Sequence, residues 1–252
     1  MSKTPVPTDS LPDVASTPDT LLDTAEHLFA TQGIENVSMR RIAAESGHGN
    51  RSGALYHFGS REALIRRLIE RRMEVVDKIR HVKLNDVLNA GQEDNVTAII
   101  AAAINVLVEV VSVHPWGPDY VLVISQAMFN PKIHFFSALD ENAVSGTLRT
   151  AAMLRRLVPH VTPEKFNKRM RIVFHESVYA FARWLQENGS LTKANQKSFQ
   201  VMVETVTEFM AAGMSAPLLA PTKTRSTAAY AKKVVARTEA RAVAQQPHQE
   251  NL

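Results

Sequence analysis

The sequence has 252 residues, no cysteine, 29 lysines and arginines against 25 aspartates and glutamates, and a formal net charge of +4. The lack of cysteine excludes disulfides and thiolate metal sites, and the slight basic excess permits nucleic acid as a partner without requiring it. We expect no signal peptide, and the longest uncharged stretch of the apolar body, 96–108, is too short to span a bilayer. The sequence therefore predicts a cytoplasmic protein with no membrane partner.

The N-terminal region predicts an arm followed by a first helix. Residues 1–16 are rich in proline, serine and threonine, a composition typical of a disordered arm. Thr17 and Pro18 are suited to the cap and first position of a helix that ends at Gly33. Its apolar residues recur at helical spacing: Leu21, Leu22, Ala25, Leu28 and Phe29. We expect this amphipathic helix to hold the helices that follow.

The stretch from Ser38 to Arg61 predicts a helix-turn-helix. Ser38 is a good N-cap for a helix over 39–46, and Gly47 ends that helix. After a short break with a second glycine, a helical pattern resumes over 51–57. Two short helices around a tight glycine turn form a helix-turn-helix motif, which commonly places its second helix in the major groove of DNA.

The polar side chains of this stretch fit DNA binding. Between Ser38 and Arg72 there are eight arginines against three glutamates, an excess that attracts a polyanion. Asn50 and Arg51 can bind base edges, while hydroxyl, imidazole and guanidinium groups nearby can bind phosphate. The predicted DNA-binding residues are Ser38, Arg40, Arg41, Asn50, Arg51, Ser52, Tyr56, His57 and Arg61. On charge alone, a solvated helix face explains the arginines equally well.

The remaining chain predicts further helices and no strand. A fourth helix begins at Ser60 and runs toward Ile79, and later helices are expected over 95–113, 120–129, 134–157, 163–187 and 193–210. We therefore expect an all-α fold of about nine helices, with a helix-turn-helix domain over 17–80 and a larger helical bundle over 81–216. The basic segment 217–252 is expected to be a flexible tail or an additional contact to DNA.

The stretch from Leu21 to Leu68 resembles the N-terminal DNA-binding domain of the TetR family of bacterial transcriptional regulators. The matching features are the Ala25, Leu28 and Phe29 face followed by Gly33, the helix start at Ser38, Gly47, and the block Tyr56-His57-Phe58-Gly59-Ser60-Arg61-Glu62-Ala63-Leu64. The resemblance implies a homodimer that binds a palindromic, double-stranded DNA operator. It also implies a larger C-terminal domain that binds a small effector and forms the dimer.

The body contains candidates for an effector pocket. Aromatic, methionine and isolated polar residues on otherwise apolar helices are either core or the lining of a pocket for an apolar small molecule. The predicted ligand-binding residues are Asn105, Glu109, Trp116, Phe129, Met153, His175 and Tyr179. Periodicity does not decide which of them faces a cavity.

The family resemblance places the last two helices in a dimer interface. The predicted interface residues are Phe166, Met170, Val173, Phe181 and Leu185 on one helix and Val203, Val206 and Met210 on the next. The alternative is that the same stripe is the core of a bundle with no partner.

Two other functional classes are an enzyme and an architectural DNA-binding protein. An enzyme is disfavoured because the sequence has no glycine-rich phosphate loop, HExxH pair, GxSxG elbow or cysteine nucleophile, and its histidines lack metal-ligand spacing. We therefore expect no catalytic residue, no cofactor and no metal. An architectural DNA-binding protein without an effector is the second alternative, which a filled core would favour and a cavity with polar groups would disfavour. The sequence favours a dimeric repressor released by a small, apolar ligand.

Overall fold

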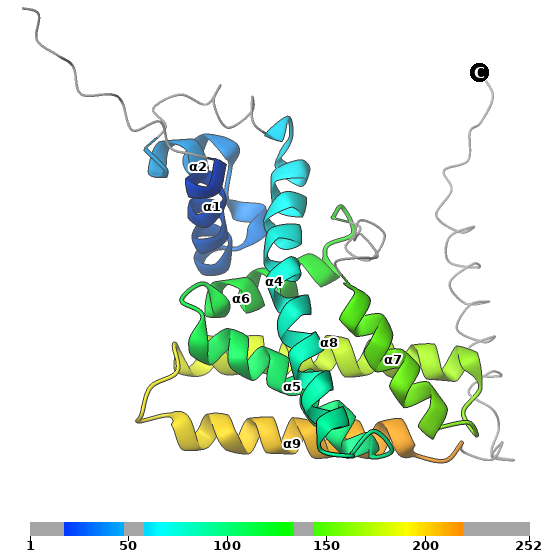
Figure 1. Cartoon of the computed structure of the whole chain (residues 1–252). Helices are drawn as coiled ribbons and strands as arrows, with labels where there is room; N and C mark the ends of the chain where they lie inside the picture. Colours follow the sequence, from blue (N-terminus) through cyan, green and yellow to red (C-terminus); the bar gives the residue numbers. More distant parts are fainter. Residues whose placement is uncertain (1–17, 48–57, 134–143, 219–252) are drawn as a thin grey trace, which may run out of the picture. The chain divides into compact units, whose positions relative to one another are not determined.

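The computed structural model describes residues 18–47, 58–133 and 144–218 of the chain. Over these residues it contains eight α-helices, one short 3₁₀ helix and no strand (Figure 1). The predicted all-α class is confirmed, and the helix count agrees with the expectation. The second helix of the predicted helix-turn-helix, 51–57, lies outside the described residues. So do the whole arm, residues 134–143 of the helix predicted over 134–157, and the tail from residue 219 onward.

The first three elements form the N-terminal domain. Helix α1 (Pro18–Gln32) is followed by the 3₁₀ helix η1 (Ile34–Asn36) and by α2 (Met39–Glu45). Gly33 separates α1 from η1 with a φ of 90°, a backbone conformation that favours glycine. The apolar face of α1, including Leu21, Ala25 and Phe29, is fully buried. This domain therefore has its own small core, as the spacing in α1 predicts.

Helix α4 (Arg61–Asn89) joins the N-terminal domain to the bundle (Figure 1). The Ser60 hydroxyl accepts a hydrogen bond from the backbone N–H of Ala63 at 3.1 Å and caps the helix, as predicted. The helix ends at Asn89, ten residues beyond the predicted limit near Ile79. The added turns keep an apolar side, because Leu84 and Val87 are buried while the polar residues around them are exposed. One uninterrupted helix of 29 residues thus contacts both parts of the protein.

Helix α5 (Val96–Val113) is the central helix of the bundle. Its N-cap is Asn95, the first residue of the predicted helix, whose side-chain oxygen accepts hydrogen bonds from the N–H groups of Thr97 and Ala98. It is the one described helix long and apolar enough to cross a membrane. The same composition suits a buried helix, and α5 packs against α4, α6, α7, α8 and α9. Its hydrophobicity is thus explained by the bundle.

Helix α6 (Gly117–Phe129) starts three residues before the predicted position, Tyr120. Gly117 and Pro118 do not break the chain here, because proline fits the first turn of a helix. A Cβ atom at Gly117 would lie 1.8 Å from the carbonyl oxygen of Val110, so only glycine allows this close approach to α5. Gly117 thus permits the close packing of α6 on α5.

The last three helices complete the bundle. They are α7 (Ser145–Leu157), α8 (Pro163–Asn188) and α9 (Gln196–Ser215). Thr162 caps α8 by accepting from the N–H of Lys165 at 3.4 Å, and Gly189 follows its end, as predicted. Helices α8 and α9 lie side by side and antiparallel (Figure 1). The chain divides into two compact units, residues 1–216 and 217–252.

Candidate nucleic-acid interface and effector cavity

Helix α2 presents two arginines to solvent. Its N-cap is Ser38, whose hydroxyl accepts from the N–H of Arg41 at 3.3 Å, and Met39 and Ile42 are buried. Arg40 and Arg41 are exposed, and Arg41 donates to Glu45 at 2.7 Å. Arg40 has no acidic partner among the described residues. After the helix, Gly47 has a φ of 81° and starts the turn, so the described half of the motif has the predicted form.

The other predicted DNA-binding residues divide into two groups. Those of the second helix lie outside the described residues: Asn50, Arg51, Ser52, Tyr56 and His57. The remaining predicted residue, Arg61, is half-buried and points into the protein. Its guanidinium donates to the carbonyl oxygens of Val37, at 3.1 Å, and of Ile34, and its Cζ lies 5.7 Å from the centre of the Phe29 ring.

These contacts give Arg61 a structural role that its charge did not indicate. A charged donor that satisfies two carbonyl groups holds the turn between α1 and α2 against the start of α4. Arg61 was predicted to contact phosphate, and that contact stays a prediction. In the described conformation, Nε and Nη2 of Arg61 each donate to a backbone carbonyl.

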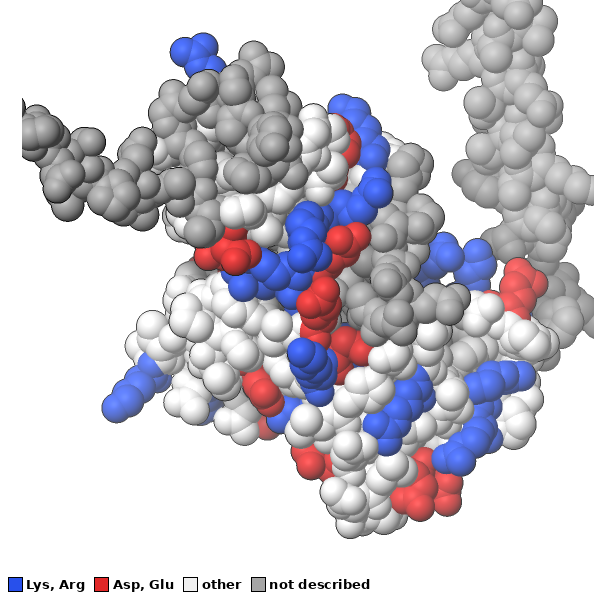
Figure 2. Space-filling model, turned by 45° about the horizontal axis from the view of Figure 1, so that its top comes forward, with Lys and Arg blue, Asp and Glu red and all other residues white. Residues whose placement is uncertain are grey.

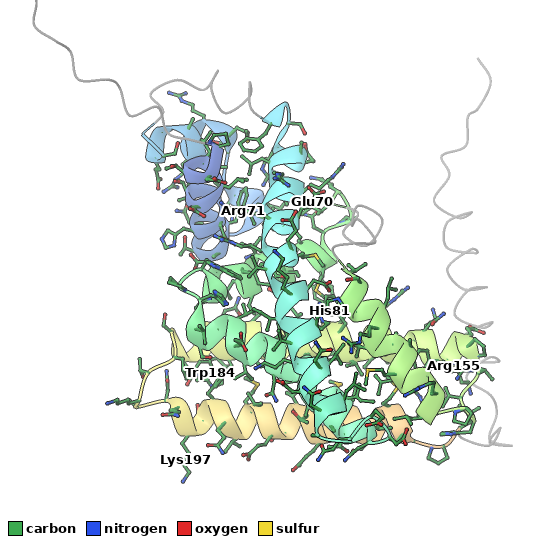
Figure 3. The ribbon with its side chains drawn as sticks, viewed as in Figure 1. Glu70, Arg71, His81, Arg155, Trp184 and Lys197 are labelled. Carbon is green, nitrogen blue, oxygen red and sulfur yellow. The ribbon has the colours of Figure 1, made fainter. Side chains whose placement is uncertain are left out.

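Much of the arginine excess is neutralised by α1. Arg71 donates to Asp23 at 2.6 Å and to Asp19 at 3.3 Å, and Arg72 donates to Asp23 at 2.9 Å. Figure 3 shows Arg71 on the side of α4 that faces α1. Figure 2 shows basic and acidic side chains interleaved in the middle of one face. The count of arginines between Ser38 and Arg72 therefore overstates the positive charge available to DNA.

The buried member of this ionic network is Glu26. Only 2% of its surface is exposed, and both of its oxygens accept from Nε of Arg72, at 2.9 and 3.1 Å. Burial raises the pKa of Glu26, against the opposing effects of the hydrogen bond and charge of Arg72. The sequence carried a signal for this network, because Asp19, Asp23 and Glu26 recur at helical spacing on one side of α1.

Helix α6 forms a second connection between the N-terminal domain and the bundle. The side-chain oxygen of Gln126 accepts from the backbone N–H of Ile34 at 2.7 Å, and its amide nitrogen donates to the carbonyl of Phe29 at 3.2 Å. Nearby, Nδ1 of His27 lies 2.9 Å from Oδ2 of Asp119. One amide thus bridges the end of α1 and the start of η1, across Gly33.

A cavity of about 50 Å³ lies between α4, α5, α7 and α8. Most of its lining is apolar and includes Ile100, Ile104, Leu107, Leu154, Val173 and Phe174. Its polar lining residues are Arg80, Thr147, Thr150 and Ser177. A mostly apolar cavity with a few convergent polar groups is the usual form of a small-molecule site.

The polar side of the cavity rests on a hydrogen-bonded network between α4 and α7. Asp77 is buried and accepts from the Ser145 hydroxyl at 2.7 Å and from the Gly146 N–H at 3.0 Å. Nη1 of Arg80 donates to the same carboxylate at 3.2 Å. Val144 gives α7 no side-chain cap, so Asp77 of α4 supplies this function from another helix.

His81 continues this network toward solvent. Its Nε2 lies 2.9 Å from the Ser145 hydroxyl and its Nδ1 lies 3.3 Å from Nη1 of Arg149. The Ser145 hydroxyl donates to Asp77, so Nε2 of His81 is the donor in its contact with Ser145. Figure 3 shows His81 where α4 passes α7. The Ser145 hydroxyl therefore accepts from His81 and donates to Asp77.

The residues predicted to bind the effector do not line this cavity. Asn105, Tyr179 and Phe129 are exposed, and Met153 is buried elsewhere in the bundle. Glu109 pairs with Lys83 at 2.6 Å, and the Trp116 ring packs on Arg72. His175 lies 6.1 Å, centre to centre, from the Phe129 ring. Their part in ligand binding stays a prediction, while Arg80 and Ser177 were not predicted.

Most of the residues predicted for the dimer interface face the protomer's own core. Phe166, Val173, Phe181, Leu185 and Met210 are buried, and Met170, Val203 and Val206 are half-buried. Met170 and Val173 of the predicted α8 stripe line the cavity, and the part of this stripe in a dimer stays a prediction. Large apolar residues are exposed on other faces of these helices: Ile172 and Tyr179 on α8, and Val201 and Phe209 on α9.

No group of three or more histidine, aspartate or glutamate side chains in the described parts of the chain is arranged to hold a metal ion.

Comparison with known families identifies both parts of the chain. A family model described as bacterial regulatory proteins of the tetR family matches residues 21–68, and a second, described as a tetracyclin repressor-like C-terminal domain, matches residues 101–213. No curated protein sequence matches.

Several solved structures share the fold. A transcription regulator of the tetR family from Shewanella sp. PV-4 is 15% identical, with a TM-score of 0.56 over 77% of this chain and 95% of that one. The fatty acid degradation regulator FadR from Bacillus halodurans is 13% identical, with a TM-score of 0.54 over 81% and 97%. FadR from Bacillus subtilis, solved with stearoyl-CoA, is 12% identical, with a TM-score of 0.52 over 78% and 99%.

The two family models follow each other in the order of the N-terminal domain and the helical bundle described above. The chain therefore belongs to the TetR family of bacterial transcription regulators.

Proposed function

We propose that the protein is a homodimeric repressor that binds a palindromic DNA operator and is released from it by a small effector. The observation that carries this proposal is the continuity of α4. Its first residue, Arg61, holds the turn before α2, and Arg80 of the same helix lines the cavity. A ligand that displaces α4 at the cavity also displaces the helix-turn-helix domain. We expect this regulator to act in the cytoplasm.

The proposed mechanism is a difference in ligand affinity between two conformations. A ligand lowers operator affinity only if it binds more tightly to the conformation that does not fit the operator. The cavity is bounded by α4 and α7, whose contact depends on Asp77. Filling it changes the packing between these two helices. Helix α6 transmits the change to α1 through Gln126, which binds the backbone of Phe29 and Ile34.

The dimer is proposed on the exposed apolar residues of α8 and α9. Ile172, Val201 and Phe209 are 53%, 53% and 71% exposed, although all three are large and apolar. Exposed apolar side chains on neighbouring helices are typical of a protein interface. Two DNA-binding domains are needed because a palindromic operator has half-sites about 34–36 Å apart, or a multiple of that spacing.

The architectural alternative lacks a reason for the cavity. A protein that only dimerises needs a filled bundle, whereas here Ser177 places a buried hydroxyl in the cavity wall. The bound stearoyl-CoA of FadR from Bacillus subtilis belongs to a protein of this fold. That ligand supports effector binding in the bundle for this chain as well.

Selection of binding sites from random double-stranded DNA tests the proposed function. We expect a palindromic sequence to be enriched and to bind two protomers. Arg51→Ala should lower affinity for that sequence more than for scrambled DNA, because it removes a base contact rather than a phosphate contact. Failure to enrich any sequence, together with equal affinity for selected and scrambled DNA, would contradict the proposal.

A further inference from the structure

The cavity contains an unused hydroxyl group. The Oγ atom of Ser177 is buried and has no hydrogen-bond partner among the described residues, and the whole residue is 5% exposed. A buried polar group without a partner is unfavourable, and natural proteins seldom retain one without a reason. Because Ser177 lines the cavity, a ligand can supply the missing partner.

Arg80 provides unused donors in the same cavity. It is 9% exposed, and only its Nη1 atom donates to a described acceptor, Asp77. Its remaining N–H groups have no acceptor among the described residues. Asp77 already accepts from Ser145 and Gly146 as well, so it does not need a further partner. A ligand acceptor can therefore bind Arg80 without displacing the pair with Asp77.

The charges around the cavity favour an anionic ligand. None of its lining residues is acidic. Thr147 of the lining is in the first turn of α7, where the carboxylate of Asp77 already accepts from the Gly146 N–H. A guanidinium group binds a carboxylate with two parallel hydrogen bonds, which a neutral hydroxyl cannot match. A cationic ligand would offer no acceptor to the remaining N–H groups of Arg80, whose charge Asp77 already balances.

The size of the cavity limits the rest of the ligand. A cavity of about 50 Å³ is small, so it suits a short hydrocarbon group better than a long acyl chain. Ile100, Ile104, Leu107 and Leu154 provide apolar surface for a short hydrocarbon group.

We propose that the effector is a short-chain monocarboxylate, whose carboxylate binds Arg80 and Ser177 and whose hydrocarbon end packs on the α5 and α7 lining. This assignment rests on the proposed function, because it names the chemical class of the effector. It differs from the long acyl-CoA bound by FadR of Bacillus subtilis.

The test is calorimetric titration of the full-length protein with butyrate and hexanoate, compared with hexanol, hexylamine and stearoyl-CoA. We expect hexanoate to bind roughly tenfold or more tightly than hexanol, because only the acid forms a charge-assisted bond with Arg80. Hexylamine should not bind. Equal affinity for hexanoate and hexanol, or binding of stearoyl-CoA without binding of either short acid, would overturn the assignment.

Two variants test the assigned residues. Ser177→Ala should leave the melting temperature unchanged or slightly higher without ligand, because it removes a buried hydroxyl that has no partner, yet weaken hexanoate binding several-fold. Arg80→Lys keeps a positive charge for Asp77 but loses the planar fork, so hexanoate should bind roughly tenfold more weakly. The matched control is Ser112→Ala on the exposed side of α5, which should bind hexanoate normally. Unchanged hexanoate affinity in both test variants would overturn the assignment.

Operator binding is measured on the same preparations, so that the two proposals fail separately. If the protein binds its selected operator but no short acid, the ligand class is wrong and the proposed repressor stands. If hexanoate binds at Arg80 and Ser177 but no duplex is selected, the site is supported and the proposed function is wrong.

Discussion

The guanidinium carbon of Arg72 lies 4.5 Å from the centre of the Trp116 ring. Arg72 belongs to α4 and Trp116 immediately precedes α6, and the same guanidinium binds Glu26 of α1. Three segments that are distant in sequence thus meet at one side chain. Since α1 belongs to the N-terminal domain and α6 to the bundle, this contact helps to fix the position of one relative to the other.

Removal of the Glu26 side chain should lower the free energy of unfolding. Glu26→Ala leaves the largely buried guanidinium of Arg72 without its main partner. We expect the free energy of unfolding to fall by about 3 kcal/mol. This is the low end for a broken buried pair, because Asp23 still accepts from Arg72. Urea unfolding measures the change. Asp19→Ala, in the same network, is the control: Asp19 is exposed, so its loss should cost at most about 1 kcal/mol. Equal losses for the two variants would contradict this interpretation.

Arg40 and Arg61 should respond differently to truncation, although both were predicted to bind DNA. Arg40→Ala should leave stability unchanged and lower the slope of log affinity against log salt by about one, because an exposed arginine that contacts phosphate acts only through charge. Arg61→Ala should lower stability by about 2 kcal/mol, because it removes charged donors from two carbonyl groups. Thermal unfolding and salt-dependent DNA binding separate the two effects. An Arg61→Ala protein as stable as the wild type would refute the structural role of Arg61.

Gln126 should be needed for a rigid N-terminal domain. Gln126→Ala leaves the N–H of the buried Ile34 without an acceptor, which should cost about 1–3 kcal/mol and reduce operator affinity. Gln126→Glu keeps an acceptor for Ile34 but cannot donate to Phe29, so it should show an intermediate loss of stability. Ser125→Ala, one residue away, serves as the control. Operator affinity equal to that of the wild type in Gln126→Ala would argue against coupling through α6.

Acid should weaken the contact between Glu35 and the residues after α6. The hydrogen bond from Asn130, followed by the charge of Lys132, lowers the pKa of Glu35 below its ordinary value of 4.5. A lowered pKa stabilises the folded state above 4.5, and this stabilisation is lost as pH falls through the lowered value. The stability difference between wild type and Glu35→Gln should therefore shrink only below pH 4.5. NMR titration of the Glu35 carboxyl group checks the direction, and a midpoint above 4.5 would contradict it.

The exposed face of α9 should control dimer formation. Phe209→Glu places a charge in the proposed interface and should weaken the dimer by about 2 kcal/mol or more. Phe129→Glu is a matched control, because Phe129 is 65% exposed but lies on α6. Sedimentation equilibrium should show a shift toward monomer only for the α9 variant. A shift in both variants, or in neither, would exclude this face as the interface.

The helices were predictable because their ends carry local signals. Ser38 and Ser60 cap helices where the sequence predicts helix starts, since an N-cap acts on backbone groups only two or three residues away. The start of α6 was misplaced because Gly117 and Pro118 can either break a helix or begin one. The choice depends on packing against α5, which is not a local property.

The site was less predictable because it depends on long-range contacts. Periodicity correctly placed Phe166, Met170, Val173 and Ser177 on one face of α8, but it does not tell whether that face meets a partner or the protomer's own core. Arg80 carried no local signal, because its burial arises from α7, more than sixty residues later. The pairing of Arg71 and Arg72 with α1 was likewise hidden in the count of charges.

The continuity of α4 constrains how this chain can tolerate insertions. Each added residue turns the remainder of an α-helix by about 100°. An insertion between Arg72 and Asp77 would therefore rotate the contacts to α1 away from those to α7. The chain could keep its ionic network with Glu26 or its cap on Gly146, but not both. The interval between Arg72 and Asp77 on α4 should consequently not tolerate a change of length.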